Sequence, residues 1–199
     1  GLVLNQSTAG NKDGVTIGEG NNAEVQIITT DSGTLKITGD ASAVVAATAG
    51  SRYDGVVISQ GALLQTDTGN IDILGKGGSG ADESRISDEN QGIKLETNNT
   101  RIVSNSGDIT LQGTSGGKAN SYGIYARGNT MYLGQADGGN YSGIITLQAD
   151  SMQLVNTSTA RLLAASSGEL RILPENVATD ISFDATGENN HLHLGNTWF

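Results

Sequence analysis

The stretch Ser106-Gly107-Asp108-Ile109-Thr110-Leu111 carries the pattern that decides the fold. A small residue and a glycine are followed by aliphatic residues two and four positions after the glycine, with a polar residue between them. The pattern returns with its glycine at Gly33, Gly69, Gly143 and Gly168, so successive copies lie 36, 38, 36 and 25 residues apart. Repeats of this length, built from short alternating segments, are typical of solenoids, in which stacked repeats share one continuous core.

Each repeat contains two further segments of the same alternating kind, which are also expected to be strands. The second begins with glycine in four copies, at residues 14–17, 55–58, 92–95 and 123–126, and lacks it at 151–154 and 180–183. The third is looser and is expected at residues 24–28, 62–66, 100–103, 130–133, 160–164 and 191–194. No segment shows helical periodicity.

Three strands per repeat with short connections cannot form hairpin sheets. Each strand is instead expected to pair in parallel with its counterpart one coil away, at about 4.8 Å. The sequence therefore predicts an all-β fold: one right-handed parallel β-helix over residues 1–199, with about six coils of three short strands. Glycine and asparagine are expected to supply left-handed backbone at the corners.

The register of this β-helix follows from the spacing of the repeats. Two inward rows are predicted, Leu35–Ile71–Ile109–Ile145–Leu170 and Ile37–Ile73–Leu111–Leu147–Ile172. On the outward face of the second strands, Lys94 should lie beneath Tyr125 and Glu96 beneath Arg127, both as solvent-exposed contacts. The longer coils grow between their first and second strands, which predicts a ridge of loops along one corner.

Composition excludes several classes of function. Hydrophobic residues make up 36% of the 199 residues, 29 are glycine and one is proline, as a thin core with many turns requires. The net charge of −10 argues against nucleic acid and anionic membrane as partners, because both are bound by clustered Lys and Arg. No apolar run reaches transmembrane length, so no membrane insertion is expected. The chain begins inside the repeat pattern and lacks an initiator Met, which suggests an internal segment of a longer protein.

Residues that could carry catalysis are isolated. Residues 77–82 (Gly-Gly-Ser-Gly-Ala-Asp) resemble the start of a calcium-binding nonapeptide, but one copy cannot share ions between turns, so a flexible acidic loop is expected. A glycosidase needs two facing carboxylates, whereas Asp72, Asp108 and Glu169 stand alone. His191 and His193 lack a third ligand. The chain has no cysteine, and we expect no catalytic, metal or cofactor site and no enzymatic activity.

Four of the five tyrosines fall between residues 122 and 141. Exposed tyrosines can stack on sugars or bind a protein partner, and they can equally be flat covers for a pleated sheet. On the first interpretation they form a candidate ligand-contact surface with two arginines: Arg85, Tyr122, Tyr125, Arg127, Tyr132 and Tyr141.

Three stretches, Asn70-Ile71-Asp72-Ile73-Leu74-Gly75, Ser106-Gly107-Asp108-Ile109-Thr110-Leu111-Gln112-Gly113 and Tyr122-Gly123-Ile124-Tyr125-Ala126, resemble the repeats of filamentous-haemagglutinin-like large exoproteins. The resemblance covers most of the chain, from about Ser32 to Ile172. It implies a secreted adhesin displayed on the bacterial cell surface and exported by an outer-membrane transporter partner in two-partner secretion. It supplies no catalytic residues.

Three functions remain open at this point. The first is a structural and adhesive shaft that presents its corner loops to a glycan or protein ligand on a host cell, a matrix or a neighbouring cell. The alternative is a carbohydrate-binding or polysaccharide-processing β-helix, such as a lyase or a phage tail-spike fragment. The third is a domain that polymerises end to end through its uncapped terminal coils.

Overall fold

The computed structural model describes residues 13–18, 25–43, 53–79, 90–96, 99–117, 121–128, 131–134, 141–156, 168–176, 180–182 and 191–193. All regular elements in these residues are β-strands. No helix long and apolar enough to cross a membrane occurs in this part of the chain.

All the strands except β15 and β16 form three parallel sheets, named here by the order of their strands within a coil. The first sheet contains β3 (Leu35–Asp40), β6 (Ile71–Lys76), β9 (Ile109–Thr114), β12 (Ile144–Ala149) and β14 (Glu169–Pro174). The second contains β1 (Val15–Ile17), β4 (Val56–Ile58), β7 (Ile93–Glu96), β10 (Ile124–Gly128) and β13 (Met152–Asn156). The third contains β2 (Gln26–Ile28), β5 (Leu63–Thr66), β8 (Thr100–Ser104) and β11 (Met131–Gly134).

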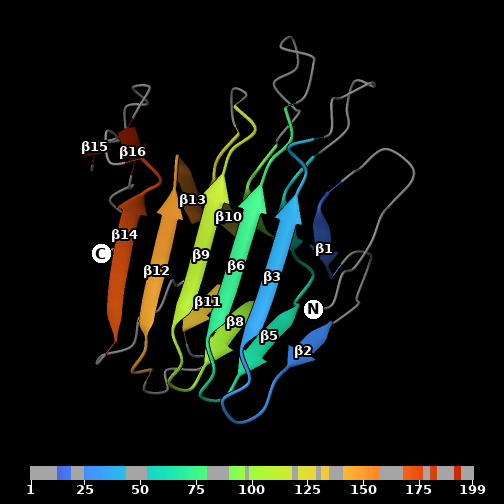
Figure 1. The fold of residues 1–199 in the computed structure, drawn as a ribbon, viewed down its shortest axis with the longest axis vertical. Helices are drawn as coiled ribbons and strands as arrows, with labels where there is room; N and C mark the ends of the chain where they lie inside the picture. The colour runs from blue at the N-terminus through green and yellow to red at the C-terminus, as the bar shows by residue number, and fades with distance from the viewer. Residues whose placement is uncertain are drawn as a thin grey trace.

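Every strand of these sheets pairs with its counterpart in the adjacent coil, as a β-helix requires. In Figure 1 the first sheet stands in front with its strands pointing up, while β1, β2 and β5 behind it point down. Successive coils advance from right to left in this view. A coil that rises in front and returns behind while it advances leftward is right-handed. The predicted right-handed parallel β-helix is therefore confirmed.

Both predicted inward rows of the first sheet are confirmed. Ile109 pairs with Ile71 on one side and Ile145 on the other, and Leu111 lies in the same way between Ile73 and Leu147. These side chains join inward residues of the other two sheets in one apolar core. The row that contains Ile109 ends in β14 at Leu170, which is 39% exposed.

The glycines that precede the second-sheet strands have a different purpose from the one predicted. Positive φ angles occur at other residues, such as Gly18 and Asn99, and not at Gly92 or Gly123. A Cβ on Gly75 at the end of a first-sheet strand would lie 2.1 Å from the carbonyl oxygen of Gly92. These glycines therefore let two backbones touch at the corner. The left-handed backbone predicted for Gly and Asn at the corners occurs in other connections, at residues such as Gly18, Gly61 and Asn99.

The predicted sixth coil differs from the structure. β15 (Asp180–Ser182) and β16 (His191–His193) were expected as second and third strands of one coil, in different sheets. They pair with each other in parallel, with Asp180 opposite His191. The prediction that these two strands belong to different sheets is wrong. Alternation of apolar and polar residues identifies a strand, but it does not say with which other strand it pairs. The third strand predicted at residues 160–164 lies outside the described residues.

The predicted site of loop growth agrees with the strand bounds. The first and second sheets are connected by residues 41–55, 77–92 and 115–123, whereas the coil that follows β12 needs only residues 150–151. This corner, called here the loop corner, borders the second sheet.

Candidate functional site

The six predicted ligand-contact residues do not form one exposed surface. Arg127 is exposed at the end of β10, and Tyr122 and Tyr132 are half-buried. Tyr125 and Tyr141 are buried, so the prediction of a surface position is wrong for both. Arg85 lies outside the described residues.

Tyr141 belongs to the core. Its side chain is fully buried, and its hydroxyl donates to the carbonyl oxygen of Gly107 at 2.9 Å, with the carbonyl oxygen of Ile144 at 3.2 Å. Burial raises the pKa of Tyr141 to about 12, with a further contribution from the charge of Asp108. The equivalent residues two positions before the repeat glycine are Asp31, Asp67 and Asn105 in the other coils. The presence of a tyrosine at a turn position that is polar in these other coils was the sequence signal that Tyr141 packs into the core.

The outward register predicted for the second sheet is confirmed. Tyr125 lies opposite Lys94, and Arg127 lies opposite Glu96. The Lys94 ammonium is 5.9 Å from the centroid of the Tyr125 ring, a cation–π distance. Tyr122 stacks on Tyr125, with ring centroids 6.1 Å apart and an interplanar angle of 18°.

The predicted exposure of Lys94 is wrong, because the residue is 0% exposed. Its row places it between Val57 and Tyr125, and both of these outward residues are also buried. The Glu96 carboxylate, which was expected to pair with Arg127, lies 3.1 Å from the Lys94 ammonium. Residues two apart on a strand share a face, which explains this pairing.

Asp54 completes the charged cluster and was missed at the sequence level. Its carboxylate is 1% exposed, and its Oδ2 lies 3.9 Å from Lys94 Nζ. Asp54 sits at the loop corner immediately before Gly55, one coil earlier than Lys94. We call Asp54, Lys94 and Glu96 the charged triad.

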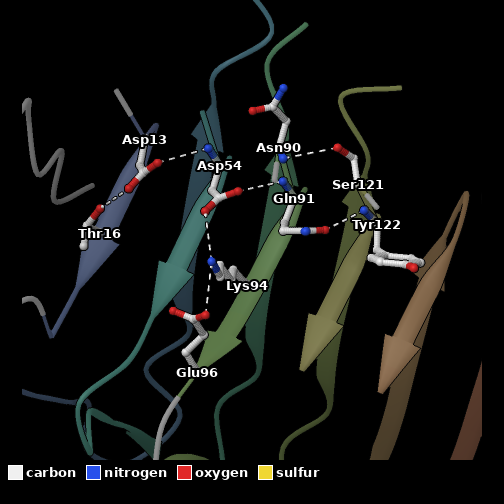
Figure 2. A network of polar contacts seen from close by, with 9 residues as sticks. All are labelled: Asp13, Thr16, Asp54, Asn90, Gln91, Lys94, Glu96, Ser121 and Tyr122. Carbon is white, nitrogen blue, oxygen red and sulfur yellow. Dashed lines mark hydrogen bonds and ion pairs between the residues drawn. The ribbon is translucent and has the colours of Figure 1, made fainter. Parts of the chain in front are cut away.

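Asp54 also takes part in a ladder of side-chain acceptors that runs along the loop corner (Figure 2). The Asp13 carboxylate accepts the N–H of Asp54 at 3.0 Å, and the Asp54 carboxylate accepts the N–H of Gln91 at 2.7 Å. The amide oxygen of Gln91 accepts the N–H of Tyr122 in turn. Each acceptor stands directly before a second-sheet glycine, so its spacing was visible in the sequence. The ladder satisfies one backbone donor per coil at the point where the loops leave the shaft.

Asn90 marks the base of the longest connection. Its N–H donates to Ser121 Oγ at 3.2 Å, and its carbonyl oxygen accepts the N–H of Gly116 at 2.9 Å. The side-chain amide is fully buried and makes no hydrogen bond in the structure. A buried amide without partners costs stability.

Candidate sites of other kinds receive little support from the geometry. No group of three His, Asp or Glu side chains among the described residues is placed to hold a metal ion. The acidic part of the nonapeptide-like stretch, residues 80–82, lies outside the described residues, as do the side chains of His191 and His193. Asp72 and Asp108 lie in register with Thr110 and Ile144, as predicted, and Asp108 caps the Ile144 N–H at 2.8 Å.

Comparison of the chain with protein-family models, with curated proteins and with solved structures found no match in any of the three. The likeness to filamentous-haemagglutinin-like exoproteins therefore rests on the repeat pattern.

Proposed function

We propose that this chain is a shaft segment of a secreted bacterial surface exoprotein, and that it presents the loops of its corner to a ligand on a host cell, a matrix or a neighbouring cell. On this proposal the protein reaches the surface through an outer-membrane transporter, as the repeat pattern implies. It has no catalytic role.

The outward face of the first sheet is the observation that carries the proposal. One outward row reads Lys36, Asp72, Thr110, Thr146 and Arg171, and the next reads Thr38, Leu74, Gln112, Gln148 and Leu173. A polysaccharide-processing β-helix is expected to carry an acidic groove along one sheet. In these two rows one acid, Asp72, stands between a lysine and a threonine, and neutral Thr and Gln ladders follow. Two further outward acids of this sheet, Asp40 and Glu169, lie opposite Lys76 and Ile144, so these acids are not paired with one another across the strands. Such a face suits a spacer.

The loop corner is suited to display. Its loops leave a backbone that is fixed from coil to coil by the acceptor ladder, and binding residues are commonly placed on loops held by a rigid scaffold. Gly77 and Gly78 belong to the scaffold, because Gly77 donates to Thr114 O at 3.0 Å and Gly78 to Tyr53 O at 2.7 Å.

The test is a glycan and extracellular-matrix array probed with the chain and with a variant in which residues 80–89 are replaced by a short Gly-Ser linker. Binding that is lost in the variant, with an unchanged melting temperature, would support adhesion through this loop. Cleavage of an arrayed polysaccharide by the chain would refute the proposal in favour of an enzyme. A blank array would reduce the role to that of a spacer.

A further inference from the structure

Two opposite charges are buried together on the outward side of the second sheet. Lys94 is 0% exposed and Asp54 is 1% exposed. Burying such a pair costs desolvation that its mutual attraction often fails to offset, so a buried pair is weak support for a purely stabilising role. The Asp54–Lys94 pair, which joins neighbouring coils, calls for another account.

We propose that Lys94 and Asp54 form an intramolecular amide (isopeptide) bond, with Glu96 as the proton carrier. Lys94 Nζ lies 3.9 Å from Asp54 Oδ2 and 3.1 Å from Glu96 Oε1. Figure 2 shows the ammonium between the two carboxylates, reached from opposite sides. The amine, the carboxyl group and a proton acceptor are thus held together in the folded chain.

The reaction is a condensation that needs no further reactant. Glu96 takes a proton from the Lys94 ammonium, and the neutral amine attacks the Asp54 carboxyl carbon. A C–N bond forms, and the C–O bond to one Asp54 oxygen breaks. Of the three protons on the Lys94 nitrogen, one stays on the amide and two leave with that oxygen as water, moved by the attacking nitrogen itself and by Glu96. One water leaves and one amide remains, so atoms, protons and charge balance.

The residues around Lys94 favour formation of the amide. Tyr125 and Val57 flank Lys94 in the adjacent strands and are buried, which lowers the polarity around the Asp54–Lys94 ion pair and favours the neutral amide over the two buried charges. Lys94 is held in place by its strand, β7, and Asp54 by its hydrogen bonds with Asp13 and Gln91, and such fixed proximity replaces a bimolecular encounter. Glu96 is 27% exposed, which gives the released water a route to solvent.

Asp54 is the better acyl group, although Glu96 is nearer to the amine. The N–H of Gln91 holds Asp54 Oδ1 at 2.7 Å, and the other oxygen is left facing Lys94. The same N–H can polarise the carbonyl during attack. Glu96 lacks such a donor among the described residues and is better placed to move protons.

Intact-mass spectrometry of the purified chain tests the proposal. The wild-type protein is expected to be lighter than its sequence by one water. Tryptic digestion should release one branched peptide, residues 53–76 joined to residues 86–101, because trypsin cannot cut after an acylated Lys94. A wild-type protein at full sequence mass overturns the proposal. A peptide of residues 86–101 that is one water lighter and not joined to residues 53–76, with Lys94 linked to Glu96, overturns it as well.

Variants separate this bond from other losses of water. Glu96→Gln and Lys94→Met should each have the full mass of their sequence, with wild-type circular dichroism confirming that they fold. Lys76→Met, at an exposed residue of the first sheet, should remain one water lighter. Asp54 precedes glycine, a sequence that also forms succinimides with loss of water. If Lys94→Met is still one water lighter than its sequence, the lost water comes from a succinimide and the proposal is overturned. If Glu96→Gln still yields the branched peptide, the role of Glu96 as proton carrier is overturned.

Discussion

Replacing Ile109 with aspartate perturbs the centre of one of the two five-residue inward rows of the first sheet. Ile109 is fully buried between Ile71 and Ile145, with coils on both sides, and no described neighbour in that row can pair with a charge. The substitution removes the burial of one isoleucine, about 1.5–3 kcal/mol. It also places a carboxylate in the core at a cost of roughly several kcal/mol, whether the group stays charged or takes up a proton.

The sum is on the order of 5 kcal/mol or more, which is comparable with the whole stability of a small domain, about 5–15 kcal/mol. A solenoid is held by contacts between nearest neighbours, so the damage should begin in the coils of β6, β9 and β12. We expect Ile109→Asp to lose its cooperative thermal transition, or to melt far below the wild type when followed by circular dichroism.

Thr110→Asp is the matched control, because it places the same carboxylate on the same strand one residue later, facing outward. Its neighbour in register is Asp72, so repulsion of up to about 1 kcal/mol is expected and no more. If Ile109→Asp melts within a few degrees of the wild type, or if Thr110→Asp is the more damaging change, the inward assignment is wrong.

Three further predictions follow from the described contacts. Because the pKa of Tyr141 is raised to about 12 in the folded chain, the unfolded chain loses this proton first as pH rises above about 10. Stability should therefore fall between pH 10 and 12, on the order of 2 kcal/mol in urea titrations, and Tyr141→Phe should lack this part of the decline. Gly75→Ala should lower the melting temperature strongly, because the new Cβ would lie 2.1 Å from the Gly92 carbonyl oxygen. Gly117→Ala is the control: its Cβ would meet no atom within 4 Å, so only the smaller cost of an alanine at a φ of +73° is expected. Equal losses of melting temperature in the two variants would refute the close-approach argument. Replacing residues 80–89 with a short linker should change the melting temperature little, because closure entropy depends weakly on loop length, and a large loss measured by calorimetry would place those residues in the scaffold.

The sequence was sufficient to predict the strands, the register and the inward rows. Alternation places Ile109 and Leu111 on the same side of their strand, and the fixed distance from the repeat glycine aligns them with Ile71 and Ile73 one coil earlier. Both features are local properties of the chain. The final strands, β15 and β16, show where this reasoning stops, since pairing depends on which coil is adjacent and not on alternation alone.

Burial on the outward faces could not be predicted in the same way. Alternation gave the direction of Lys94 and Tyr125 correctly, but an outward direction was equated with exposure. Lys94 is enclosed by the outward side chains of the two adjacent strands, Val57 and Tyr125, and by the carboxylates of Asp54 and Glu96. Tyr141 illustrates the converse, because a residue in a connection can complete the core when its ring fills the space beside Gly143.

The glycine pattern and the acceptor ladder have one physical origin. Each second-sheet glycine lets the end of a first-sheet strand touch the start of the next coil, as Gly75 touches Gly92. A contact that close turns the chain sharply, and the N–H of the residue before the glycine is then satisfied by a side chain of the preceding coil. This explains why a polar acceptor precedes Gly14, Gly55 and Gly92. Asp54 holds this position in a coil whose next neighbour carries Lys94, so a residue required by the corner also brings a carboxyl group to a buried amine.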